Sequence, residues 1–173
     1  MIWESMPIVP RNVPMIHRVY IETSFVSYLT ARPNREVVVA GHQQSTHDWW
    51  NRYRSSYELC ASLLVLREAG AADPEAAKER LDVLAGMILL ETTEEALDLA
   101  KELVKAGALP AKAESDALHI GVAATQGVPY LLTWNCRHMA NATMRLLIES
   151  VCASRGHRAP IICTPEELLE SEP

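Results

Sequence analysis

Four polar side chains stand where elements of regular structure are expected to end, and their types suit divalent-metal chemistry. Carboxylate and amide oxygens are the ligands that hard cations such as Mg²⁺ prefer. A bound cation relieves the repulsion within an acidic cluster, lowers the pKa of a water molecule and offsets charge on a phosphate. The four residues are Glu22 after VYI, Glu68 in LVLREAG, Asp116 in SDALHIGVAA and Asn135 in LLTWN.

Glu22 is the hardest of the four to explain without a function. A carboxylate directly after a buried apolar run is costly to bury unpaired. Thr23 and Ser24 could cap the following helix, so we expect Glu22 to be a metal ligand and not a cap. The other three have simpler explanations: a solvated helix position for Glu68, a partner of the helix dipole for Asp116 and a turn for Asn135.

Strands and helices are predicted to alternate along the chain. Short apolar or β-branched runs predict strands at 18–22, 58–62, 87–90, 130–134 and 160–163. Apolar spacing, caps and glycines predict helices after residue 22 and at 36–57, 63–70, 74–86, 94–107, 112–126 and 140–151, with a last helical turn in TPEEL. This alternation predicts a three-layer α/β/α fold around a mainly parallel sheet. Ligands of such sheets bind beyond the carboxyl ends of the strands, where Glu22 and Asn135 would meet if their strands are neighbours.

Composition limits the classes of function. The 173 residues include 16 basic and 22 acidic side chains, a net charge of −6. A bulk basic surface for nucleic acid is therefore absent, and binding a polyanion needs a local basic rim or a metal ion. The cysteines form no CxxC pair, which argues against a zinc ribbon or a redox motif.

The length suggests one domain, and the amino terminus lacks the pattern of a signal peptide. We expect residues 1–15 to be a loosely ordered extension and 16–173 to be a single domain. No apolar run is long enough to span a bilayer, so we expect a cytoplasmic protein with no membrane partner.

Other side chains are weaker candidates for a role in the site. Arg32, Arg137 and His138 could form a basic rim for phosphates, although a solvated surface explains each equally well. His119 lies one helical turn after Asp116 and could orient a carboxylate, but a packed, satisfied histidine is the commoner case. An aromatic stripe at helical spacing could stack bases, although it more often belongs to the core or a subunit contact: Trp49, Trp50, Tyr53 and Tyr57.

In their order and spacing, VYIETS, the helical Glu68, the DALHIGVAA helix and LLTWN resemble the PIN-domain family. The chain is most similar to the VapC-like toxin ribonucleases of type II toxin–antitoxin systems, over roughly residues 17–168. The resemblance implies a parallel sheet between helices, with acids that converge on one or two Mg²⁺ or Mn²⁺ ions. The family's four site positions fall on Glu22, Glu68, Asp116 and Asn135, and its hydroxyl falls on Thr23 or Ser24. Two positions depart from the family pattern. The first acid is more often Asp, whereas here it is Glu22, and the fourth position is often Asp, whereas here it is Asn135.

The sequence therefore predicts a metal-dependent endoribonuclease that hydrolyses RNA with a metal-activated water. Glu22, Glu68 and Asp116 would hold the ion, supported by Thr23, Ser24 and the neutral Asn135. The resemblance also implies a cognate antitoxin protein and self-association, such as a homodimer. Two alternatives stay open: a non-catalytic PIN-like RNA-binding or interaction protein, and a DNA nuclease that uses the same acids.

Overall fold

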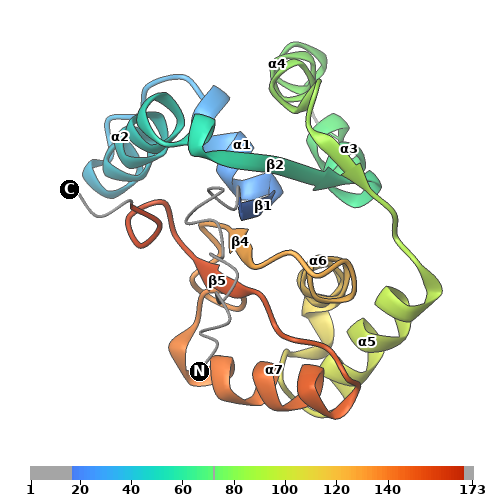
Figure 1. The fold of residues 1–173 in the computed structure, drawn as a ribbon. Helices are drawn as coiled ribbons and strands as arrows, with labels where there is room; N and C mark the ends of the chain where they lie inside the picture. Colours follow the sequence, from blue (N-terminus) through green and yellow to red (C-terminus); the bar gives the residue numbers. More distant parts are fainter. Residues whose placement is uncertain (1–16, 72, 170–173) are drawn as a thin grey trace, which may run out of the picture.

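Five parallel strands form one sheet in the order β3-β2-β1-β4-β5 (Figure 1). The structure, a computed structural model, describes residues 17–71 and 73–169, so the predicted extension 1–15 lies outside the described residues. The strands are β1 (His17–Ile21), β2 (Tyr57–Ser62), β3 (Ile88–Leu90), β4 (Tyr130–Leu132) and β5 (Ile161–Cys163). The prediction of a mainly parallel sheet is confirmed.

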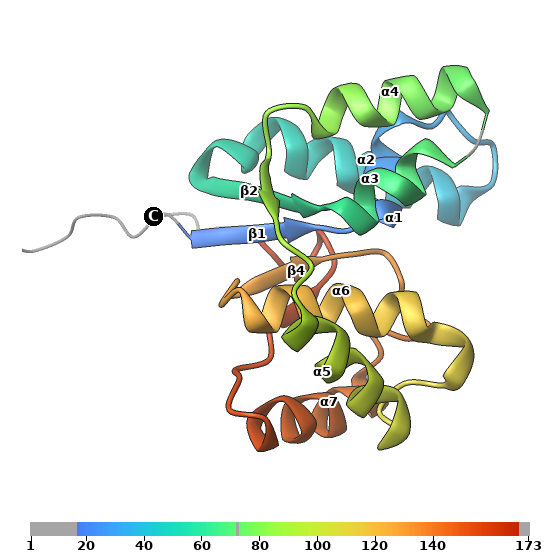
Figure 2. The same ribbon diagram turned by 90° about the vertical axis from the view of Figure 1, so that its right-hand side faces the viewer.

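Helices cover both faces of this sheet, as Figure 2 shows. One face carries α1 (Thr23–Thr30), α2 (Val37–Arg52), α3 (Leu63–Gly70) and α4 (Pro74–Leu84). The other face carries α5 (Glu94–Lys105), α6 (Glu114–Thr125) and α7 (Ala142–Ser154). Two short 3₁₀ helices, η1 (Arg54–Ser56) and η2 (Ala111–Ala113), precede β2 and α6. The predicted three-layer α/β/α architecture is thus confirmed.

The second half of the central strand, β1, is completely buried. Val19, Tyr20 and Ile21 of β1 have no exposed surface, because β2 and β4 flank the strand and helices lie on both sides. Beneath the sheet, α5 and α6 approach closely at Gly121 of α6. A Cβ at Gly121 would lie 2.5 Å from the carbonyl oxygen of Ala96, so only glycine fits this contact. The helix that carries Asp116 and His119 is therefore held tightly against its neighbour.

Several predicted elements have different ends in the structure. The helix predicted over 36–57 ends at Arg52, and Tyr57 belongs to β2, where it pairs with His17 of β1. Aromatic residues suit both helical packing and strands, and the pairing with β1 determines which one Tyr57 joins. The strand predicted over 130–134 ends at Leu132, and TPEEL forms a turn instead of a helix.

The aromatic stripe is largely structural. The Trp49 side chain is buried, its Nε1 donates to the carbonyl oxygen of Leu168 at 2.7 Å, and its ring contacts Phe25 and Tyr57. Trp50 packs partly buried against the same core, with the Arg54 guanidinium 4.7 Å from its ring centroid. These contacts favour a packing role for the stripe over base stacking.

None of the helices within the described ranges is both long and apolar enough to cross a bilayer. Three of the four cysteine thiols are buried, and burial raises the pKa of each. They are Cys60, Cys152 and Cys163. A thiol held in its neutral form is a poor nucleophile and a poor metal ligand.

Candidate metal centre at the carboxyl edge of the sheet

Glu22 lies directly after β1, at the carboxyl edge of the sheet. Its backbone N–H continues the ladder to β4 by donating to the carbonyl oxygen of Leu132 at 3.1 Å. Its side chain is 8 % exposed, and Oε2 accepts hydrogen bonds from three groups. These are the backbone N–H of Ser24 at 3.0 Å, the hydroxyl of Ser24, and the hydroxyl of Thr133 at 2.7 Å. The carboxylate is therefore held in one orientation.

The expectation that Glu22 is not a helix cap is wrong. Glu22 is the N-cap residue of α1, because its Oε2 accepts the Ser24 N–H at the first turn. The Ser24 hydroxyl donates a hydrogen bond to Glu22, and the Thr23 hydroxyl donates one to Glu68. Neither hydroxyl therefore caps the helix. One oxygen of Glu22 is thus used in capping. The other, Oε1, accepts no hydrogen bond from the described residues and lies 3.9 Å from His119 Nε2.

Glu68 reaches the same place from the last turn of α3. Its Oε2 accepts hydrogen bonds from the hydroxyl of Thr23 and from His119 Nε2, the latter at 3.0 Å, and its Oε1 accepts one from the hydroxyl of Ser115. Partial burial of Glu68 raises the pKa of its carboxyl group. The hydrogen bonds and charge of His119, with the two hydroxyls, outweigh burial and lower the pKa of Glu68 to about 2. Glu68 is therefore ionised at neutral pH.

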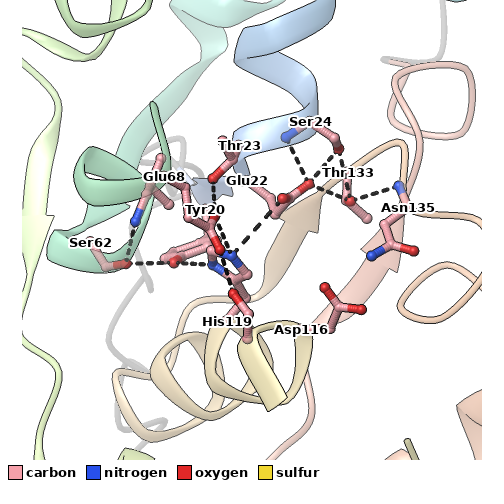
Figure 3. Close-up of polar contacts among 12 residues, drawn as sticks. Tyr20, Glu22, Thr23, Ser24, Ser62, Glu68, Asp116, His119, Thr133 and Asn135 are labelled. Atoms are coloured by element: carbon pink, nitrogen blue, oxygen red, sulfur yellow. Dashed lines mark hydrogen bonds and ion pairs between the residues drawn. The ribbon is translucent and has the colours of Figure 1, made fainter. Parts of the chain in front are cut away.

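His119 joins the two acids from α6. Its ring is 1 % exposed, with Nε2 facing Glu68 and Nδ1 at 2.8 Å from the hydroxyl of Tyr20 (Figure 3). The Tyr20 hydroxyl in turn lies 2.7 Å from the hydroxyl of Ser62. Burial raises the pKa of Tyr20 far above its ordinary value, so this phenol stays protonated. His119 is therefore both a packed histidine and one that contacts a carboxylate.

Three groups at this edge have the composition and spacing of a metal site. Ligand atoms of Glu22, Glu68 and His119 all lie within 4.8 Å of one another. Two carboxylates with one imidazole could hold a divalent cation, and the free Oε1 of Glu22 offers lone pairs in the same region. The chemistry of these donors thus fits the metal ion that the sequence implied.

Asp116 and Asn135 lie beside this group but outside it (Figure 3). Asp116 is in the first turn of α6, as predicted, and its Oδ2 lies 2.8 Å from His138 Nδ1. Asn135 Oδ1 accepts the backbone N–H of His138 at 3.1 Å, which is the turn role weighed for it from the sequence. His138 thus contacts both Asp116 and Asn135, and its ring lies against the first turn of α6.

The other two residues predicted for the basic rim do not join the acids. The Arg32 side chain is 92 % exposed and lies 3.6 Å from the carboxylate of Glu75, on α4. Arg137 is also exposed, and within the described part of the chain its hydrogen bond is through its backbone oxygen, which accepts from the side-chain amide of Asn141. Neither side chain contacts the Glu22–Glu68–His119 group among the interactions of the described residues.

Several residues that complete the site escaped the sequence reasoning. Tyr20, Ser62, Ser115 and Thr133 all contact a member of the site or lead to one. For three of them the position near a recognised residue was a usable signal, because Ser115 precedes Asp116, Thr133 comes two residues before Asn135 and Tyr20 comes two residues before Glu22. Ser62 offered no such signal, since it read as an ordinary strand residue.

Comparisons with known proteins bear on the fold. No protein-family model matches the chain, and no curated protein is significantly similar to it in sequence. Among solved structures, it is similar to Mycobacterium tuberculosis VapC20, a toxin that cleaves the sarcin–ricin loop. The TM-score is 0.55 at 15 % identity, covering 72 % of this chain and 95 % of the other. A chain of Rickettsia felis VapBC2, solved bound to a DNA fragment from its promoter, gives TM-score 0.55 and 15 % identity over 85 % and 98 % of the two chains. The chain therefore has the PIN-domain fold of the VapC toxins.

Proposed function

We propose that this chain, with its PIN-domain fold, is a metal-dependent endoribonuclease and the toxin of a toxin–antitoxin pair. The observation that supports this most is the convergence of Glu22 and Glu68 at the carboxyl edge of the sheet. Each carboxylate has one oxygen fixed by two or more donors, as expected of preorganised ligands. Two acids held together in a protein of net charge −6 are well suited to a cation and poorly suited to a bare polyanion.

The residues have distinct roles in this proposal. Glu22 and Glu68 would hold Mg²⁺ or Mn²⁺, with Asp116 as a third carboxylate at the start of α6. The hydroxyls that orient these first two carboxylates belong to Thr23, Ser24 and Thr133. His138 lies next to Asp116 and is itself hydrogen-bonded to Asn135. When bound, the ion supplies the positive charge that acidifies water and offsets charge on the scissile phosphate. Arg137 and Arg32, both exposed, are candidates for contacts with more distant phosphates.

The partners follow from the same resemblance. VapC20 cleaves the sarcin–ricin loop, so a structured ribosomal RNA loop is the first substrate to test here. VapBC2 is a toxin–antitoxin complex, and we propose a small antitoxin protein and a homodimer for this chain by analogy. A small overlapping reading frame upstream of the gene would support this assignment.

The test is cleavage of a single-stranded RNA and of a sarcin–ricin loop RNA, with Mg²⁺, with Mn²⁺ and with excess chelator. We expect cleavage only with metal, and none by Asp116→Asn protein that melts at the same temperature as the parent. Lys112→Gln, an exposed change before the same helix, serves as the matched purification control. Cleavage that survives in chelator or in the Asp116→Asn protein would exclude this mechanism. Competition with single-stranded DNA separates an RNase from a DNA nuclease.

One observation favours the non-catalytic alternative. Asn135 Oδ1 already accepts a hydrogen bond from the backbone N–H of His138, and the fourth position brings no charge to the site. An RNA-binding PIN-like protein would bind RNA and metal without cutting. Asn135→Asp should tighten Mn²⁺ binding in calorimetry if the position faces the ion. Metal binding by both proteins, with no cleavage of any RNA or DNA tested, would favour this alternative.

A further inference from the structure

A buried chain of side chains leads from the start of α3, through the sheet, back to Glu68 near the end of the same helix. Ser62 Oγ lies 2.7 Å from Tyr20 Oη, Tyr20 Oη lies 2.8 Å from His119 Nδ1, and His119 Nε2 lies 3.0 Å from Glu68 Oε2 (Figure 3). The first three side chains are at most 1 % exposed. Ser62 is also the N-cap residue of α3. The chain therefore joins β1, α6 and both ends of α3.

The hydrogen in the last link must come from His119. An ionised carboxylate only accepts, so the contact with Glu68 requires a hydrogen on Nε2. This holds for the neutral ring and for the imidazolium. In the neutral ring, Nδ1 accepts from the Tyr20 hydroxyl and Tyr20 accepts from Ser62, so every polar atom of the chain has a partner. A ring nitrogen that carries a hydrogen has no lone pair for a metal ion.

We propose that His119 is a positioning residue, not a third metal ligand: its Nε2–H holds the Glu68 carboxylate, while Tyr20 and Ser62 fix the imidazole ring. Of the three clustered side chains, Glu22 and Glu68 are then the metal ligands, and His119 is a hydrogen-bond donor that orients the Glu68 carboxylate. The part of this proposal that concerns metal affinity rests on the proposed function; the position of the hydrogen does not.

The packing explains why Glu68 needs such a support. It extends on a flexible side chain from an eight-residue helix, and fixing a glutamate costs considerable rotamer entropy. Thr23 of α1 and His119 of α6 both donate hydrogen bonds to Oε2 of Glu68, and Ser115 donates one to Oε1. A carboxylate fixed in advance loses less entropy when an ion binds.

A consequence for the choice of ion follows. Without the imidazole among the ligands, the donors are oxygens only. Oxygen-only sites suit Mg²⁺ and Mn²⁺, whereas an imidazole ligand shifts preference towards Zn²⁺ and other later transition metals. His119 in the positioning role thus keeps the site selective for hard ions.

The first test locates the hydrogen by ¹⁵N NMR of protein labelled in its histidines. The chain has 6 histidines, and loss of one signal set in the His119→Gln protein assigns His119. We expect Nε2 to carry a hydrogen in the metal-free protein and to keep it at saturating Mg²⁺. An Nε2 without hydrogen in the metal-free protein, or one that loses its hydrogen on addition of Mg²⁺, would overturn the proposal.

The second test measures Mn²⁺ affinity by calorimetry in three variants. His119→Leu removes the donor and should weaken binding about 10–100-fold, as is usual when a group that supports a metal ligand is lost. His119→Gln keeps an N–H donor and should restore most of the affinity. Tyr20→Phe deletes only the hydroxyl and should weaken binding. Tyr130→Phe is the matched control, because its hydroxyl makes no hydrogen bond with the described residues. Equal loss in both His119 variants, or no loss in Tyr20→Phe, would contradict the positioning role.

The two proposals fail separately in these experiments. If the parent protein binds no Mg²⁺ or Mn²⁺, the proposed function is wrong, yet NMR of the metal-free protein still decides where the hydrogen of His119 lies. If the parent binds metal and cuts RNA but Nε2 loses its hydrogen to the ion, the function stands and the positioning role is wrong. Circular dichroism and melting of each variant establish that the fold is retained.

Discussion

The hydroxyl of Thr23 donates a hydrogen bond to Oε2 of Glu68. Thr23 is the first residue of α1 and directly follows Glu22, whereas Glu68 lies in the last turn of α3. The residue next to one acid therefore fixes the other acid, 45 positions away along the chain. This contact couples the two carboxylates, so a change at either helix is expected to alter both.

Thr23→Val should weaken metal binding without unfolding the protein. The change removes the hydroxyl that restrains Glu68 and keeps a branched side chain of similar size. We expect Mn²⁺ affinity to fall about 10-fold or more, in the range for lost partners of metal ligands. Thr30→Val is the matched control, since the Thr30 hydroxyl, in the same helix, donates to the backbone oxygen of Val26 and to no other described residue. Equal calorimetric affinities for the two variants would remove Thr23 from the site.

Glu22 should prove to be a ligand as well as a cap. Its Oε2 is occupied by Ser24 and Thr133, so Glu22→Gln can retain these hydrogen bonds through its amide oxygen while losing the charge. We expect metal affinity and cleavage in the order Glu, then Asp, then Gln far below, at nearly unchanged thermal stability. A Gln variant that binds Mn²⁺ as well as the parent would make the carboxylate purely structural.

The stability of the metal-free protein should depend on pH through Glu68. Its pKa is lowered to about 2 in the folded state, from an ordinary value near 4.5. The ionised group therefore stabilises the fold above pH 4.5, and this contribution is lost as the pH falls from 4.5 towards 2. Solvent screening reduces its size, because 30 % of the Glu68 side chain is exposed.

Urea unfolding in the presence of chelator, from pH 6 to pH 2.5, measures this dependence. The Glu68→Gln protein should show a smaller loss of unfolding free energy over that interval than the parent. Parallel curves for the two proteins would mean that the hydrogen bonds to Glu68 do not lower its pKa in solution.

Trp49→Ala should destabilise the fold more than Trp50→Ala. The Trp49 ring is buried against Phe25 and Tyr57, and its Nε1 donates to the carbonyl oxygen of Leu168. Because the substitution removes these contacts, we expect the free energy of unfolding to fall by about 3–5 kcal/mol. Trp50 is only partly buried, and its loss should cost less. Reduced RNA affinity at unchanged stability and oligomeric state, in either variant, would instead point to base stacking.

Much of the fold could be predicted because its signals are local. The β-branched and aromatic runs, the Asp73–Pro74 start of α4 and the Thr93 cap of α5 each specify an element through neighbouring residues. Glu22 could be singled out for the same reason, since a carboxylate next to Val19–Ile21 conflicts with burial. The end of α2, which was predicted at residue 57 and lies at Arg52, shows the limit of such signals. Tyr57 has no local preference strong enough to decide between helix and strand, and pairing with His17 decides it.

Local signals in the sequence identify which kinds of group the site contains and which elements carry them. Which of these groups meet depends on how the elements pack in three dimensions. The strand order places β1 between β2 and β4, so Glu22 comes to lie beside Thr133, while α3 and α6 bring Glu68 and His119 to it. The same packing pairs Asp116 with His138. These contacts join residues from 22 to 111 positions apart, and no periodicity of 2 or 3.6 residues encodes such distances, because they depend on how whole elements pack.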